Sequence, residues 1–358
     1  MAIHFHPLTV KAIKKQTPEC VSITFNIPEE LQQDFAFTHG QNVTIKALVN
    51  GEEIRRSYSI CSAPHENELT VAVKKISDGK FSNFANDQLQ QGDVLEVLPP
   101  TGKFNTTLNA ASKKNYLAFA AGSGITPVIS IIKSTLLTEP QSNFTLVFGN
   151  RDKASIIFFE ELEGLKNKYL QRFNFINLLS RERTEADVFF GRINNEKLAQ
   201  LSKLIQYNQQ DEIFICGPQE MIFCVKDFLV AQGIDNKKIH FELFTTPGAS
   251  KEKITATSDK DTLQIKSTVQ IKLDGRTVAF QMGFDNSSIL DAALKQGADL
   301  PFACKGGVCC TCKAKLLEGK VDMDVNWGLE QEEIEQGFIL TCQSHPLTDK
   351  VVIDFDAR

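Results

Sequence analysis

Apolar and polar positions change their pattern twice along the chain and mark three stretches. Up to about residue 108, short β-branched and aromatic runs alternate with Gly, Pro, Asn and Asp turns. This spacing predicts an antiparallel barrel or sandwich. The runs are Val21 to Phe25, Asn42 to Ala47, Leu69 to Lys74 and Val94 to Val97.

The middle stretch, residues 115–244, alternates apolar runs with segments of helical period. Such alternation predicts βαβ units that build a parallel sheet. The strand-like runs are Tyr116 to Ala121, Phe144 to Phe148, Phe173 to Leu179 and Glu212 to Cys216. The helical segments include Pro127 to Leu137 and Gln219 to Gln232.

The third stretch begins with two strand-like runs on either side of Asp274-Gly275, the pattern of a β-hairpin, and a short helix is predicted around Ile289 to Gln296. The segment before this stretch contains Pro, Gly, Ser, Thr and Lys and has no apolar periodicity. This composition predicts a flexible linker whose ends lie on the order of 25 Å apart. A chain of 358 residues exceeds what one hydrophobic core usually organises. We therefore predict a multidomain protein with a barrel domain at 1–110, an α/β domain at 111–245, a linker at 246–266 and a third domain at 267–358.

Composition narrows the classes of function. The formal net charge of -5 is modest and spread along the chain, which argues against a nucleic-acid partner and leaves acidic patches for docking a protein. The first residues lack a leader pattern, and no run of about 18 uncharged apolar residues occurs. We expect no membrane insertion and a cytoplasmic protein.

The cysteines carry the most specific signal. Of nine cysteines, Cys304, Cys309 and Cys312 form the spacing C-x4-C-x2-C, and Cys342 follows further along the chain. This is the spacing of plant-type [2Fe-2S] clusters, in which four thiolates hold two irons. Glycines between the first two ligands would let backbone amides approach the sulfur atoms.

A zinc site is the alternative, although zinc sites usually pair C-x2-C with a second C-x2-C. Cys310 is a fifth thiol in the same loop. As a ligand it would give the poorer spacing C-x5-C-x1-C, so we interpret it as a bystander.

Other motifs suit phosphates and planar rings. A Gly-rich strand-to-helix turn is suited to a dinucleotide pyrophosphate, although the third glycine of the usual fingerprint is replaced here. An arginine fork suits a phosphate, and a tyrosine face suits a ring. The motifs are Arg56-Ser57-Tyr58-Ser59, Val73-Lys74 before Gly79-Lys80-Phe81-Ser82, Gly122-Ser123-Gly124-Ile125-Thr126-Pro127, Cys216-Gly217-Pro218 and Glu242-Leu243-Phe244.

Together these motifs resemble those of the ferredoxin-NADP reductase superfamily, here followed by a plant-type ferredoxin. The resemblance implies an antiparallel β-barrel that binds FAD, an α/β domain with a parallel sheet that binds NAD(P), and a C-terminal α+β domain of β-grasp fold that holds the [2Fe-2S] cluster. By the resemblance, Tyr58 lies against the isoalloxazine, Ser59 reaches toward flavin N5 and Arg56 pairs with the pyrophosphate.

The same resemblance assigns the other motifs. Gly79, Phe81 and Ser82 belong to the turn that receives the FAD pyrophosphate, and Val73 and Lys74 belong to the strand that backs the flavin. The nicotinamide turn contains Gly122 and Gly124, with Thr126 near the flavin. Cys216, followed by Gly217 and Pro218, is placed beside nicotinamide C4, whereas the residue taken alone would be interpreted as an inert core thiol. Glu242 and Phe244 return an acid and an aromatic ring to the flavin.

The choice of nicotinamide depends on the residues after the run that ends at Leu179. Ser180 and Arg181 follow it, and no acid occupies the ribose-reading position. A hydroxyl and a guanidinium suit a 2′-phosphate, which favours NADPH over NADH, although Glu182 lies next to them. Arg151 and Arg192 are further candidates.

The function that the resemblance implies is a relay from NADPH through FAD and the cluster to a di-iron oxygenase component. Reductases of multicomponent oxygenases and of fatty-acid desaturases share most of these residues. Two other classes remain open: a zinc-stabilised binding protein without redox activity, and a simple electron carrier.

Overall fold

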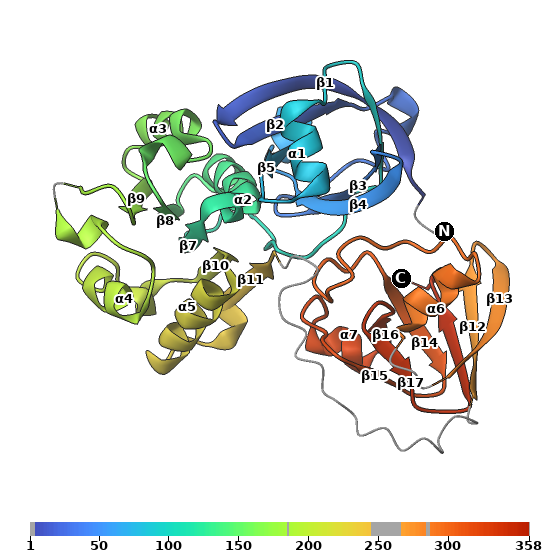
Figure 1. Cartoon of the computed structure of the whole chain (residues 1–358). Helices are drawn as coiled ribbons and strands as arrows, with labels where there is room; N and C mark the ends of the chain where they lie inside the picture. The colour runs from blue at the N-terminus through green and yellow to red at the C-terminus, as the bar shows by residue number, and fades with distance from the viewer. Residues whose placement is uncertain (1–3, 185, 245–265, 284–286, 358) are drawn as a thin grey trace. The chain divides into compact units, whose positions relative to one another are not determined.

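The computed structural model describes residues 4–184, 186–244, 266–283 and 287–357, and these form two compact units (Figure 1). The first unit contains two sheets, and the second is centred on the C-terminal sheet. The predicted linker at 246–266 lies outside the described residues, except for Lys266, where a strand begins. Within the described residues, no helix combines the length and apolar character needed to cross a membrane.

The N-terminal sheet has six antiparallel strands in the order β4-β3-β6-β1-β2-β5. A bridge between Ile60 and Val71 joins the end of β4 to β5 and thereby connects the two edges of the sheet. Its interior is apolar, with Ile23, Ile45 and Val71 fully buried. The elements are β1 (His6–Thr17), β2 (Cys20–Asn26), β3 (Asn42–Val49), β4 (Glu52–Ser59), β5 (Leu69–Lys74), α1 (Lys80–Asp87) and β6 (Val94–Val97).

The middle sheet has five parallel strands in the order β11-β10-β7-β8-β9, as the alternating pattern predicts. The chain starts at the centre, moves outward to β9 and then crosses to β10. The carboxyl ends of β7 and β10 therefore form a topological switch point, where open α/β sheets bind ligands. The elements are β7 (Asn115–Ala121), α2 (Ile125–Thr138), β8 (Asn143–Asn150), α3 (Phe159–Lys168), β9 (Phe173–Leu179), α4 (Asn195–Leu201), β10 (Glu212–Gly217), α5 (Gln219–Ala231) and β11 (Ile239–Leu243).

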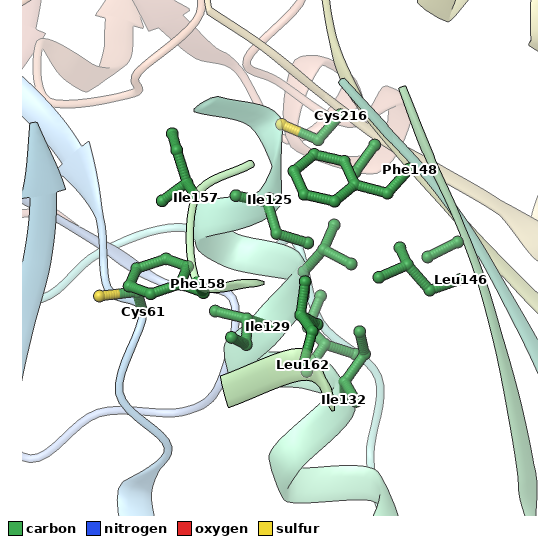
Figure 2. Packing of buried hydrophobic residues seen from close by; sticks show 14 of the residues in the cluster. Cys61, Ile125, Ile129, Ile132, Leu146, Phe148, Ile157, Phe158, Leu162 and Cys216 are labelled. Carbon is green, nitrogen blue, oxygen red and sulfur yellow. The ribbon is translucent and has the colours of Figure 1, made fainter. Parts of the chain in front are cut away.

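Helix α2 joins these two sheets into one unit. Figure 2 shows Ile125, Ile129 and Ile132 of α2 within a buried apolar cluster that also contains Cys61 and Cys216. The Ser130 hydroxyl of the same helix donates to the Ser62 carbonyl at 2.7 Å. The buried ammonium of Lys133 pairs with Glu66 at 2.8 Å and Glu161 at 2.9 Å. These contacts hold the barrel and the parallel sheet in one arrangement.

The C-terminal sheet is mixed, with the order β13-β12-β18-β14-β16 and a parallel pair formed by β12 and β18. The predicted hairpin is present: Asp274 and Gly275 have φ of 53° and 68°, as a tight two-residue turn requires. The predicted helix begins after its cap Ser288. The elements are β12 (Lys266–Leu273), β13 (Arg276–Gly283), α6 (Ile289–Lys295), β14 (Lys313–Glu318), β15 (Val321–Met323), α7 (Gln331–Glu335), β16 (Phe338–Leu340), β17 (Ser344–Pro346) and β18 (Lys350–Asp354).

Candidate active site and candidate cluster site

The fold brings together Ser59, Cys216 and Glu242, which the family resemblance places at the flavin and the nicotinamide. Ser59 ends β4, and its hydroxyl donates to Glu242 Oε2 at 2.9 Å, across 183 positions of sequence. Glu242 in β11 is the register partner of Cys216 in β10. Burial raises the pKa of the Cys216 thiol well above its usual value, and the charge of Glu242 raises it further. Cys216 is therefore a neutral thiol at neutral pH.

The Gly-rich turn after β7 approaches the C-G-P turn after β10 closely. A Cβ on Gly124 would lie 2.1 Å from the Cys216 carbonyl oxygen, so only glycine fits this position. The Thr126 hydroxyl is buried and donates to the Ser123 carbonyl at 3.0 Å, which closes the turn. Two turns at the switch point are thus packed backbone against backbone.

A cleft of about 710 Å³ lies beside these turns. An Asn150 side-chain nitrogen, Nδ2, is buried at the cleft and has no hydrogen-bond partner among the described residues. A volume of this size with backbone turns, guanidinium groups and a spare amide donor fits an extended, anionic dinucleotide. The cleft residues that the sequence nominated are Lys74, Gly122, Arg151, Ser180, Arg181, Arg192, Gly217, Pro218 and Phe244.

Three guanidinium groups give the cleft basic character. Arg151, Arg181 and Arg192 all line it. Glu182 does not: its carboxylate accepts from the Lys153 backbone amide at 2.8 Å. The Ser180 hydroxyl donates to the Asn150 carbonyl at 3.2 Å. Glu182, the acid next to the predicted 2′-phosphate site, is therefore hydrogen-bonded to the backbone of a neighbouring turn.

The residues nominated for the flavin lie on β4, β5 and α1. Arg56 and Tyr58 are two positions apart in β4 and so project from the same face. The Tyr58 ring lies 5.4 Å from the buried ring of Phe81. Val73 is fully buried in the barrel core, so only its backbone can face a cofactor.

The turn before α1 is also tightly built. The Ser82 hydroxyl accepts from the Ile76 amide at 3.2 Å. A Cβ on Gly79 would meet that hydroxyl at 2.3 Å. Lys74 lies near the nicotinamide turn, because a Cβ on Gly122 would come within 3.6 Å of its ammonium group.

Sequence reasoning missed part of the cleft. Asn194, Glu220 and Cys224 also line it. Glu220 stands in the first turn of α5, two residues after the C-G-P motif. That proximity is the one signal from which its position could have been found; Asn194 and Cys224 carry no such signal.

The four predicted cluster ligands lie in the second unit as two neighbouring pairs. A hydrogen bond from the Cys309 thiol lowers the pKa of Cys304 to about 6. A hydrogen bond between Cys312 and Cys342 raises the pKa of Cys312 and lowers that of Cys342. Cys310 points elsewhere, because its thiol donates to the Gly328 carbonyl.

Backbone amides already surround these sulfur atoms. The Gly306 amide donates to Cys304 Sγ at 3.3 Å, and the Cys304 amide donates to Cys309 Sγ at 3.5 Å. Lys305 and Gly307 hold left-handed φ of 50° and 75°, which turn the loop around the thiols. Such N–H···S bonds are the contacts that tune a bound iron-sulfur cluster.

The pairing also bears on the zinc alternative. Among the described residues, no three His, Cys, Asp or Glu side chains converge closely enough to hold a single metal ion. A [2Fe-2S] cluster needs only two thiolates at each iron. The two neighbouring pairs of thiols meet this requirement.

Comparisons with known proteins agree with this arrangement. Family models match an oxidoreductase FAD-binding domain at 7–106, an oxidoreductase NAD-binding domain at 119–227 and a 2Fe-2S iron-sulfur cluster binding domain at 271–347. The predicted cofactors FAD, a nicotinamide dinucleotide and [2Fe-2S] are thereby confirmed.

Relatives that match along nearly the whole chain show the family to which it belongs. The chain is 47% identical to a subunit of the 1,2-phenylacetyl-CoA epoxidase of Escherichia coli K12, over 99% of this chain and 98% of that protein. It is 35% identical to the ferredoxin reductase component of 3-ketosteroid-9-alpha-monooxygenase of Rhodococcus rhodochrous, over 97% and 96% of the two chains. Phthalate dioxygenase reductase shares the fold, with a TM-score of 0.57, 23% identity and 98% of both chains covered. The chain therefore belongs to the family of oxygenase reductase components that combine FAD-binding, NAD-binding and [2Fe-2S] domains in one polypeptide.

Proposed function

We propose that this protein is the NADPH-dependent reductase of a di-iron oxygenase of the phenylacetyl-CoA epoxidase type. The main support is the 47% identity to the epoxidase subunit of Escherichia coli along nearly the whole chain. The alternative is the reductase of another multicomponent oxygenase or of a fatty-acid desaturase, since the monooxygenase relatives share the same three domains at lower identity.

The residues proposed for hydride transfer lie in the unit with two sheets, and the proposed cluster ligands lie in the C-terminal unit. FAD, when bound, would accept a hydride as two electrons and one proton, and a [2Fe-2S] cluster would then take the electrons one at a time. Ser59, whose hydroxyl donates to Glu242 at 2.9 Å, would place its oxygen atom toward the flavin, and Glu242 would fix the orientation of that hydroxyl. Cys216 supplies a neutral, buried surface beside the nicotinamide. Cys304, Cys309, Cys312 and Cys342 hold the cluster.

Arg181 is proposed to bind the 2′-phosphate of NADPH. Because a charge-assisted hydrogen bond contributes about 1.5–3 kcal/mol, Arg181→Ala should raise KM for NADPH roughly 10- to 100-fold and leave KM for NADH unchanged. Steady-state ferricyanide reduction with each nucleotide measures both values. Arg183→Ala is the matched control, because Arg183 is exposed and does not line the cleft. An equal rise in both KM values would contradict a role at the 2′-phosphate.

Reconstitution tests the proposed partner. The remaining subunits of the Escherichia coli phenylacetyl-CoA epoxidase would be combined with this protein, NADPH and phenylacetyl-CoA. We expect NADPH oxidation coupled to formation of the epoxide. The oxygenase component of the Rhodococcus 3-ketosteroid monooxygenase serves as the comparison acceptor. Faster turnover with the steroid oxygenase, or none with the epoxidase, would refute the assignment.

A further inference from the structure

One lysine is almost completely buried next to the cleft, and the chemistry proposed above does not use it. Lys197 in α4 is 6% exposed. Its ammonium group donates to the carbonyl oxygens of Asp187 and Val188 at 3.1 and 2.9 Å and to Gln200 Oε1 at 2.7 Å. An ammonium group has three donors, so all of them are used, as a buried charge requires. Two of the three bonds reach out of the helix to the loop that precedes it.

That loop leads directly into a wall of the cleft, formed by residues 191–194. A Cβ on Gly191 would lie 3.6 Å from Lys197 Cε, so the lysine side chain packs against this wall. The wall ends at Asn194, whose side-chain oxygen accepts from the Lys197 amide at 2.8 Å. Lys197 itself does not line the cleft. It therefore holds the chain before the wall and at its end without reaching the space where a nucleotide would lie.

The wall is also attached to the strand end that leads into the proposed 2′-phosphate site. The Gly191 amide donates to the carbonyl of Leu179, the last residue of β9, at 2.9 Å. Arg181 follows Leu179 by two residues, and Arg192 follows Gly191 by one. Both arginines line the cleft. Two guanidinium groups thus come from chain segments that are joined at Leu179.

The ammonium group of Lys197 can make Arg192 a better ligand for a phosphate. An arginine side chain on a loop loses conformational freedom when it binds, and this loss weakens binding. A loop that is fixed in advance avoids part of that cost. Hydrogen bonds from a charged donor are stronger than those between neutral groups, so an ammonium group fixes the two loop carbonyls more firmly than a neutral side chain would.

We propose that Lys197 is a positioning residue for nucleotide binding: its ammonium group holds the loop at 187–188 against α4 so that Arg192 is presented to the 2′-phosphate of NADPH. This inference deepens the proposed function and rests on it, because NADPH is the nucleotide assigned there. Lys197 acts through Arg192 and makes no contact with the nucleotide itself.

A double-mutant cycle tests this dependence, because two residues that act on one contact have effects that do not multiply. Lys197→Met keeps the length of the side chain and removes the ammonium group. Arg192→Ala should raise KM for NADPH roughly tenfold and Lys197→Met about fivefold, while kcat and KM for NADH stay unchanged. The double variant should have the KM of Arg192→Ala alone. Steady-state ferricyanide reduction with each nucleotide measures all of these values.

Lys203→Met is the matched control. Lys203 lies two residues beyond the end of α4, is exposed and does not line the cleft. The control removes the same charge and should keep every value of the wild type. Thermal unfolding shows whether each variant is folded at the assay temperature. If Lys197→Met is not, Lys197→Gln, which loses the charge and keeps a hydrogen-bond donor, replaces it in the cycle with the same expected pattern.

An unchanged KM for NADPH in either single variant, or a double variant whose KM is the product of the two single effects, would overturn the inference. An equal rise in KM for NADH and NADPH in Lys197→Met would also overturn it, since the lysine would then support the cleft as a whole. A wild-type protein that does not prefer NADPH would contradict the nucleotide assignment in the proposed function. The cycle is then measured with NADH: a double variant equal to Arg192→Ala still supports positioning by Lys197, and multiplied effects refute it.

Discussion

Replacing Cys342 by serine is expected to abolish electron transfer to an oxygenase or to cytochrome c and to leave NADPH-dependent ferricyanide reduction largely intact. Cys342 contributes one of four thiols in two neighbouring pairs, and its loss leaves Cys312 without its partner. Ser59, Cys216 and the residues of the nicotinamide cleft lie in the other compact unit, so they are not affected. Parallel steady-state assays with the two kinds of acceptor measure the effect.

Cys310→Ser provides the matched control. Cys310 stands in the same loop, but its thiol is hydrogen-bonded to the Gly328 carbonyl. The variant should keep the cluster and both activities. Loss of the cluster in Cys310→Ser, or equal loss of both activities in Cys342→Ser, would show that the ligands or the separation of modules have been assigned wrongly.

Ser59→Ala is expected to slow reduction of the bound flavin by NADPH on the order of 100-fold. The variant removes the hydroxyl that Glu242 holds at 2.9 Å, and misplacement of the reacting groups by loss of a positioning contact can cost about 100-fold in rate. Anaerobic stopped-flow absorbance follows flavin bleaching directly. The affinity for NADPH should stay unchanged, because Ser59 does not line the cleft.

Ser59→Thr keeps a hydroxyl at the same position and tests whether the group itself matters. We expect this variant to retain most of the wild-type rate. Equal slowing in both variants would indicate that the pocket is disturbed by packing, and an unchanged rate in Ser59→Ala would remove Ser59 from the mechanism.

Much of the fold could be predicted because its signals are local. Strands β7 to β10 are nearly continuous apolar runs, as expected for a parallel sheet covered on both faces, and β9 was predicted at its observed bounds. Strand β1 was not predicted from pattern. Its exposed residues include Lys11, Lys14 and Lys15, which obscure the alternation of a strand that lies inside the sheet.

The site was less accessible to sequence reasoning, because its contacts are long-range. The cysteine spacing alone nominated the cluster ligands, since a loop imposes its geometry locally. The contact between Ser59 and Glu242 depends on how two sheets are joined, which no local pattern records. Likewise, Glu182 is adjacent to Arg181 in sequence, and only the fold turns its carboxylate toward Lys153.

One absorption spectrum, recorded on freshly purified protein before and after anaerobic addition of NADPH, tests most directly whether a flavin and an iron-sulfur cluster are linked in this chain. We expect a yellow-brown sample with flavin and iron-sulfur bands that NADPH bleaches. A colourless protein that contains zinc, or a coloured protein that NADPH leaves unchanged, would contradict the relay.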